Sequence, residues 1–205
     1  MDKIVEIKRK NGVATIKMLS GDTLRVPSAL YLERRLHVNQ MIDPEAYRLY
    51  LRQRGYAHAL EAAMKFLALR ERSEQEVRAR LRRSCYGEET IARVMETLTR
   101  HALVSDGRFA EQWTDSRKKK YGRGRIAREL RMKGVSENEA RAALADFSGE
   151  EEYERAYGQA VKMTRKFRGD AKKIAQALLR RGYGWSVARK AAEAAVKAAG
   201  PEAGS

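Results

Sequence analysis

Side chains suited to acid–base, nucleophilic or metal chemistry are few in this chain and stand apart from one another. The three histidines, His37, His58 and His101, lack metal-binding spacing, and a metal site needs several converging ligands. Cys85 is the only cysteine, and no histidine adjoins it in sequence to stabilise a thiolate, so we expect it to be structural. The sequence contains neither a CxxC pair nor a phosphate-binding GxxxxGKS/T loop. We therefore expect no catalytic residues, no metal, no other cofactor and no enzyme activity.

The strongest chemical signal is the stretch RKKKYGRGRIARELRMKGV at 117–135, whose charge suits contact with a polyanion. Only Glu129 is acidic, whereas nine of the first seventeen residues are basic. These nine are Arg117, Lys118, Lys119, Lys120, Arg123, Arg125, Arg128, Arg131 and Lys133. The first four follow a helix, whose C-terminal dipole favours cations. The next helix opens with Arg123, Arg125 and Arg128, at the end where the dipole disfavours cations. That placement favours contact with a polyanion or an acidic partner over the alternative, a solvated helix face.

Two glycines and two apolar residues define how this basic stretch should be presented. Ile126 and Leu130 are four residues apart, so they should bury one side of a helix and leave Arg123, Arg125, Arg128 and Arg131 to project. Gly122 and Gly124 carry no Cβ, so we expect them to let the preceding loop approach the backbone of a partner.

A second basic segment, RKFRGDAKK at 165–173, occupies the equivalent place further along the chain. Its candidate contact residues are Arg165, Lys166, Arg168, Lys172 and Lys173. Trp185 aligns with Glu88 and Glu137, which are positions that should be solvated. It is therefore a candidate for stacking or partner contact, with packing on a neighbouring unit as the alternative. Trp113 aligns with apolar residues and is expected in the core.

These segments recur because the helical part of the chain repeats with a period of about 48 residues. The aligned apolar positions are Val77, Ile126 and Ile174, and then Leu81, Leu130 and Leu178. The middle helix of each unit should begin after Ser73, Gly122 and Asp170, which act as N-caps. It should be followed by Cys85, Gly134 and Gly182, at positions where a left-handed C-cap is expected. The third helix should follow Gly87, Ser136 and Gly184.

The predicted class is mainly α, with three tandem three-helix repeats in an elongated, curved array and a small N-terminal β-hairpin module. Alternation around Asn11-Gly12 predicts the hairpin, TLRV predicts a third strand, and Asp43-Pro44 predicts the start of a helix. The expected ranges are 1–56 for the hairpin and linker-helix module, 57–104, 105–149 and 150–198 for the repeats, and 199–205 for a flexible tail.

Composition restricts the partners and the compartment. The chain has 205 residues, 43 basic and 27 acidic, and a net charge of +16, which favours nucleic acid or an acidic partner. A single cysteine suits a reducing compartment, and the N-terminus MDKIVEIKRK resembles no targeting peptide. No apolar run approaches the roughly 20 residues that a membrane helix needs. We expect a cytoplasmic monomer without membrane contact.

The residues around the basic stretch resemble the RecX family of RecA-recombinase regulators. The family has a helix start of the form D-x-RFA, seen here at Asp106, Arg108, Phe109 and Ala110. A basic, glycine-containing loop follows, and then I-x-x-EL-x-x-KG, seen at Ile126, Glu129, Leu130, Lys133 and Gly134. The preceding repeat is similar at Ser73, Glu76, Val77 and Leu81. The chain departs from the family pattern at His101-Ala102, where a Gly-Tyr pair is usual, and at Cys85.

The resemblance implies a protein that binds the RecA recombinase filament on single-stranded DNA and inhibits strand exchange and ATP hydrolysis, and so modulates recombination and DNA repair. It implies no catalytic residue or cofactor, and it assigns no contact residues. Beside the RecA filament, we expect direct contact with single- or double-stranded DNA. The alternative function is that of a general DNA-binding protein built from helix-turn-helix-like units. Against that alternative, the net charge is spread as +5, +2, +4 and +5 over 1–56, 57–104, 105–149 and 150–205 rather than confined to one recognition helix.

Overall fold

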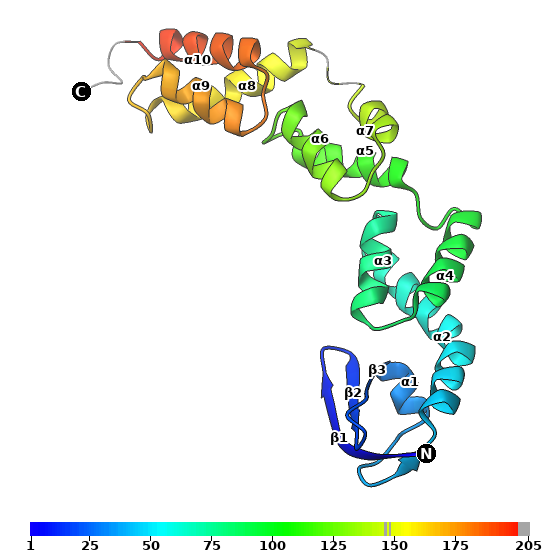
Figure 1. Ribbon diagram of the computed structural model, residues 1–205. Helices are drawn as coiled ribbons and strands as arrows, with labels where there is room; N and C mark the ends of the chain where they lie inside the picture. The colour runs from blue at the N-terminus through cyan, green and yellow to red at the C-terminus, as the bar shows by residue number, and fades with distance from the viewer. Residues whose placement is uncertain (146, 148, 201–205) are drawn as a thin grey trace. The chain divides into compact units, whose positions relative to one another are not determined.

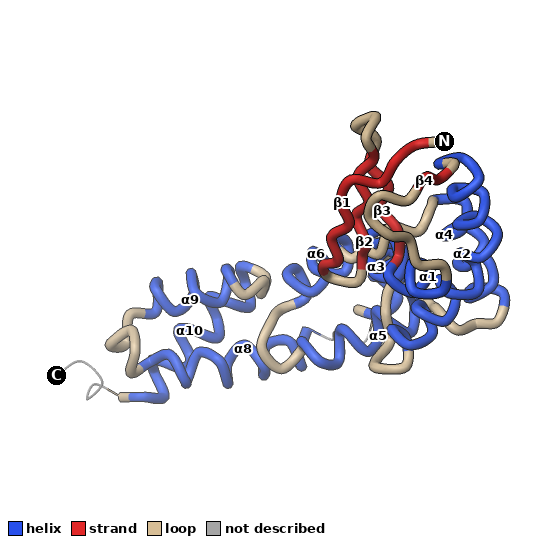
Figure 2. Tube along the Cα trace, turned by 90° about the horizontal axis from the view of Figure 1, so that it is seen from below, coloured by secondary structure: helices blue, strands red, loops and turns tan. Residues whose placement is uncertain are grey.

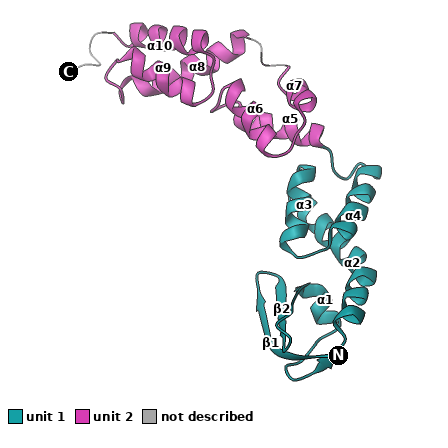
Figure 3. Cartoon of the chain, viewed as in Figure 1, with its two compact units in different colours: residues 1–105 teal, residues 106–205 magenta. Residues whose placement is uncertain are grey.

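The structure, a computed structural model of the chain, describes residues 1–145, 147 and 149–200. It divides into two compact units, residues 1–105 and 106–205, coloured separately in Figure 3. Most described residues are helical, and the described strands all lie near the N-terminus, where Figure 2 draws them in red. The predicted class, mainly α with a small N-terminal strand module, is confirmed. From position 201 onward, the tail expected at 199–205 lies outside the described residues.

The strands of unit 1 form one antiparallel sheet in the order β3-β2-β1-β4, of which Figure 1 labels β1 to β3 and Figure 2 labels β4 as well. They are β1 (Asp2–Lys10), β2 (Val13–Met18), β3 (Thr23–Pro27) and β4 (Met41–Ile42). The turn between β1 and β2 has positive φ at Asn11 (52°) and Gly12 (78°), which confirms the predicted hairpin. The sequence did not predict β4, because a strand of two residues is too short to show periodicity.

The helices of unit 1 pack with the sheet around one hydrophobic core. They are α1 (Ser28–Glu33), α2 (Pro44–Leu67), α3 (Glu74–Arg83) and α4 (Glu88–Arg100). The core joins Ile16 of the sheet to Leu81 of α3 and Ile91 of α4. Asp43 caps α2 by accepting hydrogen bonds from the N–H groups of two residues in its first turn, as expected. Because α2 runs unbroken through residue 56, the predicted limit of the N-terminal module falls inside a continuous helix.

Unit 2 contains two helical clusters that follow each other along the chain. The first is α5 (Asp106–Arg117), α6 (Arg123–Met132) and α7 (Glu137–Ala143), and the second is α8 (Gly149–Thr164), α9 (Ala171–Arg180) and α10 (Trp185–Ala199). Ile126 and Leu130 lie in the core of the first cluster, and Ile174 and Leu178 lie in the core of the second. Leu81, Leu130 and Leu178 are all fully buried, as the sequence repeat predicted.

The helix ends confirm the caps predicted from the repeat. Ser73, Gly122 and Asp170 are the N-caps of α3, α6 and α9. The residues after these helices have positive φ, with 64° at Cys85, 82° at Gly134 and 87° at Gly182. Gly87, Ser136 and Gly184 are the N-caps of α4, α7 and α10, and Ser136 forms a complete capping box with Glu139.

Candidate nucleic-acid and filament interface

Eight of the nine cations of the basic stretch fall into two groups, an exposed group and an anchored group that comprises Arg117, Arg125 and Lys133. The anchored group surrounds Glu129, the only acidic residue of the stretch. Its carboxylate accepts a hydrogen bond from Trp113 Nε1 at 3.1 Å and pairs with Arg125 Nε at 3.1 Å. Arg117 Nε lies 3.3 Å from the same carboxylate, as an ion pair without hydrogen-bond geometry. Glu129 therefore neutralises two of the nine cations from within the chain.

Aromatic rings complete the anchoring of these side chains. The guanidinium of Arg117 lies 4.4 Å from the centre of the Trp113 ring, and that of Arg125 lies 3.9 Å from the centre of the Tyr121 ring. Lys133 Nζ lies 4.8 Å from the same Trp113 ring. The expectation that Arg125 projects freely is therefore wrong. The (i, i+4) spacing of Arg125 and Glu129 is a sequence signal that could have revealed this pair.

The exposed group comprises Lys119, Lys120, Arg123, Arg128 and Arg131. All five side chains are exposed, and none forms an ion pair within the part of the chain that the structure describes. Lys118 is half-buried and pairs with Asp115. Ile126 and Leu130 are buried on one side of α6. The side chains of Arg123, Arg128 and Arg131 project from its other sides and are therefore exposed.

The glycines of the basic stretch approach the chain's own backbone. The N–H of Gly122 donates to the carbonyl of Arg181 at 3.0 Å, and that of Gly124 donates to the carbonyl of Gly182 at 3.0 Å. A Cβ on Gly122 would lie 2.5 Å from the Gly182 oxygen, and a Cβ on Gly182 would lie 2.3 Å from the Arg125 nitrogen. We call this contact the glycine joint. It corrects the expectation that these glycines receive a partner's backbone, because the space is occupied within unit 2.

Other polar contacts hold the basic loop against α8. Glu152 accepts a hydrogen bond from the backbone N–H of Arg123 at 3.0 Å, and Gln159 donates to the carbonyl of Lys119 at 3.0 Å. The Glu152 carboxylate thus occupies the N-terminal end of α6, where an acidic group is favourable. Burial raises the pKa of the Tyr183 hydroxyl, which follows the glycine joint in sequence.

The second basic segment contributes further exposed cations to unit 2. Arg165, Lys166, Arg168 and Lys172 are exposed and have no ion pair among the described residues, whereas Lys173 pairs with Asp170 at 3.1 Å. The backbone N–H of Lys173, followed by its side chain, lowers the pKa of the Asp170 carboxyl. Trp185 is 64% exposed, and it lines a hollow of about 330 Å³ together with Lys172 and Arg189.

The residues considered for other chemistry do not gather into a site in the described parts of the chain. No group of three or more His, Cys, Asp or Glu side chains there could hold a metal ion. Cys85 is half-buried just after α3, and the His58 ring forms a hydrogen bond with the Glu33 carboxylate. The hydrogen bond from His58, followed by that from Arg54, lowers the pKa of the Glu33 carboxyl. No described helix combines the length and the apolar character needed to cross a membrane.

Comparison with known proteins decides the family. A family model described as the second three-helix domain of RecX matches residues 105–144, and one described as the first three-helix domain matches residues 59–98. A protein named Regulatory protein RecX from Mycolicibacterium smegmatis is 33% identical over 141 residues, which cover 63% of this chain and 75% of that relative. The chain belongs to the RecX family.

Other RecX proteins extend the similarity along the chain. A Regulatory protein RecX from Clostridium perfringens is 26% identical over 186 residues and is matched over 88% of each chain. A crystal structure of regulatory protein RecX has a TM-score of 0.63 and 23% identity, and the match covers 91% of this chain and 97% of that one. The crystal structure of RecX from Lactobacillus salivarius has a TM-score of 0.62 and 23% identity, over 68% of this chain and 96% of that one. These two structures share the fold.

Proposed function

We propose that this RecX-family chain regulates the RecA recombinase by binding the RecA filament on single-stranded DNA and inhibiting strand exchange and ATP hydrolysis. Family membership carries this proposal, because the relatives are named regulatory proteins RecX. The exposed cations of unit 2 that have no ion pair with a described residue support it, since a filament that holds DNA presents phosphates. The proposal requires no catalytic residue and no cofactor.

Within this proposal, α8–α10 is a third unit of the same kind as α2–α4 and α5–α7. The matching caps and the aligned leucines support that reading, although the two family models match only the first and second units. Three tandem units offer several separate contact points along a polymer. The proposed DNA contacts in unit 2 are the exposed group, together with Arg165, Lys166, Arg168, Lys172 and Trp185.

The deciding experiment is the DNA-dependent ATPase of RecA, measured on single-stranded DNA with increasing amounts of this protein. We expect inhibition when the protein is substoichiometric to RecA, because a filament regulator acts on assembled RecA subunits. Inhibition that begins only when the protein can cover all the DNA would support the alternative, a general DNA-binding protein. The titration is then repeated at the same RecA concentration with twice the DNA. A general DNA-binding protein would then be needed in twice the amount to inhibit, whereas the amount of a filament regulator would stay the same.

A further inference from the structure

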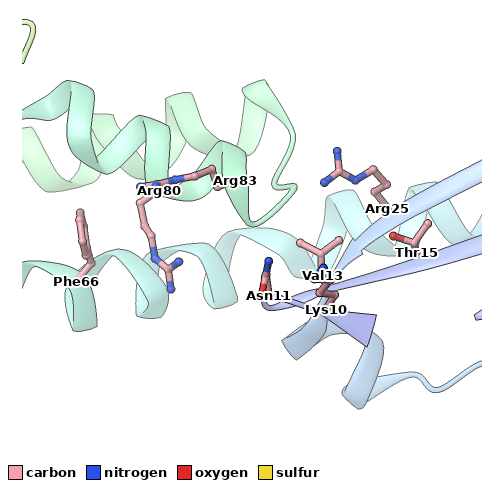
Figure 4. A pocket seen from close by; sticks show the side chains of 8 residues that line it. All are labelled: Lys10, Asn11, Val13, Thr15, Arg25, Phe66, Arg80 and Arg83. Atoms are coloured by element: carbon pink, nitrogen blue, oxygen red, sulfur yellow. The ribbon is translucent and has the colours of Figure 1, made fainter. Parts of the chain in front are cut away.

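A hollow in unit 1 gathers cations that are distant in sequence. It has a volume of about 650 Å³ and lies between the β-sheet and α3, with α2 alongside (Figure 4). Lys10 and Arg25 line it from the sheet, and Arg80 and Arg83 line it from the last turns of α3. Among the described residues, no Asp or Glu lines this hollow, which we call the cationic hollow.

The strand register explains how the sheet presents its part of the hollow. Thr15 pairs with Arg25, and Lys10 pairs with Val13, so these four side chains share one face of the sheet. The opposite face carries the buried residues of the core, such as Ile16 and Val26. The cationic hollow therefore lies on the solvent-accessible face of the sheet, because the opposite face packs into the core.

The four cations have no counter-ion among the residues that the structure describes. All four side chains are exposed, and none forms an ion pair within the described part of the chain. The C-terminal dipole of α3 offsets the charges of Arg80 and Arg83. Lys10 and Arg25 lie on strands instead, so the dipole of α3 does not offset their charges in the same way. Folding thus concentrates uncompensated positive charge in a concave site, and a bound anion would relieve that repulsion.

The other lining groups indicate which anion fits. Three of the four cations are arginines, whose planar guanidinium groups bind phosphate through two parallel hydrogen bonds. Asn11 and Thr15 add an amide and a hydroxyl that can donate to phosphate oxygens. Phe66 of α2 adds a half-buried ring, and the Arg72 guanidinium lies 3.9 Å from the centre of that ring. Cations beside an aromatic ring are the combination that binds single-stranded nucleic acid.

We propose that the cationic hollow binds the phosphate backbone of single-stranded nucleic acid, as a site separate from the cations of unit 2. Arg80 and Arg83 hold neighbouring phosphates, with Lys10 and Arg25 facing them from the sheet. This site concerns DNA alone and does not depend on contact with RecA. Its failure can therefore be distinguished from failure of the proposed regulation.

The test measures binding of the full-length protein to a fluorescent thymidine oligonucleotide by anisotropy, without RecA, over a range of salt concentrations. We expect Arg80→Ala combined with Arg83→Ala to raise the Kd at least about tenfold, since each arginine loses charge-assisted hydrogen bonds. The log–log salt slope should become shallower by about 1.4, because single-stranded DNA contributes about 0.7 per neutralised phosphate. Circular dichroism and Tm should stay unchanged, since both side chains are exposed.

The matched control removes two other arginines of unit 1. Arg35→Ala with Arg52→Ala gives the same loss of charge from exposed side chains that lie outside the cationic hollow. We expect this control to change the Kd by less than about threefold. A further variant, Arg80→Lys with Arg83→Lys, should keep the salt slope but bind more weakly, because lysine cannot make the two-pronged contact.

Three results would overturn the assignment. Equal oligonucleotide affinities of the Arg80/Arg83 variant and the Arg35/Arg52 control would show that single-stranded DNA does not bind in the cationic hollow. Displacement of the oligonucleotide by free nucleoside triphosphate at the same phosphate concentration would make it a nucleotide site. If the Arg80/Arg83 variant lost inhibition of RecA but kept its oligonucleotide affinity, the cationic hollow would instead bind an acidic protein surface.

Discussion

Cys85 is a residue whose backbone conformation, rather than its thiol, explains its place in the chain. It follows α3 with a φ of 64°, and the equivalent residues after α6 and α9 are Gly134 and Gly182. A side chain in this left-handed region is strained, and glycine is not. The thiol lies 3.9 Å from the carbonyl of Arg83 and is half-buried.

We expect Cys85→Gly to leave the free energy of unfolding unchanged or to raise it by up to about 1 kcal/mol, because relief of strain outweighs the added freedom of the unfolded chain. Urea denaturation measures the change. The converse substitution, Gly134→Ala, should lower the free energy by about 1 kcal/mol at a comparable φ of 82°. A clear loss of stability in Cys85→Gly would give the thiol a packing role.

Substitution of Leu130 tests whether the apolar positions that align between the repeats are buried. Its side chain is fully buried in the α5–α7 core, so Leu130→Ala should lower the free energy of unfolding by about 2–5 kcal/mol. Met132 lies on the same helix but is 69% exposed, so Met132→Ala should cost less than about 0.5 kcal/mol. Similar losses in the two variants, measured by urea denaturation, would disprove this account of α6.

At the scale of elements, α6 is positioned by contacts at both of its ends. Glu129, in its last turns, holds Arg125 and the Trp113 indole, which ties α6 to α5. The glycine joint at its start ties α6 to the turn between α9 and α10. The basic stretch is therefore part of a braced structure, and only its exposed group is available to a partner.

Gly122→Ala should open the glycine joint without melting the helices. Its Cβ would meet backbone atoms of Gly182 and Tyr183 at 2.5 Å, and backbone cannot move aside as a flexible side chain can. Loss of the two backbone hydrogen bonds should cost about 2 kcal/mol. Hydrogen exchange of peptides covering 118–125 should become faster, while far-UV circular dichroism stays constant.

Gly158→Ala is the control for this experiment, because a Cβ at that position of α8 meets nothing within 4 Å. Alanine has the higher helix propensity, so this variant should be neutral or slightly more stable. Unchanged exchange at 118–125 in Gly122→Ala would mean that the joint does not hold the loop.

At the scale of the whole molecule, the net charge of +16 acts through the cations that form no ion pair with another described residue. Charge reversal at Arg125 would place a second carboxylate beside Glu129 and lower stability, so it cannot test binding alone. Arg123 and Arg128 are exposed and unpaired among the described residues, which makes them the cleaner choice.

Arg123→Glu combined with Arg128→Glu should weaken binding to RecA–single-stranded DNA filaments while leaving Tm unchanged. The control, Lys190→Glu with Lys197→Glu, makes the same change in net charge on exposed positions of α10. On duplex DNA, about six phosphate contacts would give a log–log salt slope near −5, and the arginine variant should be shallower by about 1.8. If the two variants weakened filament binding equally, the exposed arginines of α6 would form only a solvated helix face.

Local signals in the sequence determined where most elements begin and end. Asn11-Gly12 predicted the hairpin because positive φ is a property of those two residues, and Asp43-Pro44 predicted the start of α2 for the same kind of reason. The spacing of Ile126 and Leu130 predicted their burial, since helical periodicity acts within one turn. Caps, turns and stripes depend on residues within about four positions of each other.

The tertiary structure alone decided which residues distant in sequence meet. The contact of Gly122 with Gly182 depends on how α5–α7 packs against α8–α10, and no pattern within either segment encodes it. The same is true of two contacts in unit 1. β4 pairs with the start of β1, and Lys10 and Arg80 line the same hollow. Such contacts arise from packing of whole elements, whose free energy is summed over many side chains rather than carried by a local motif.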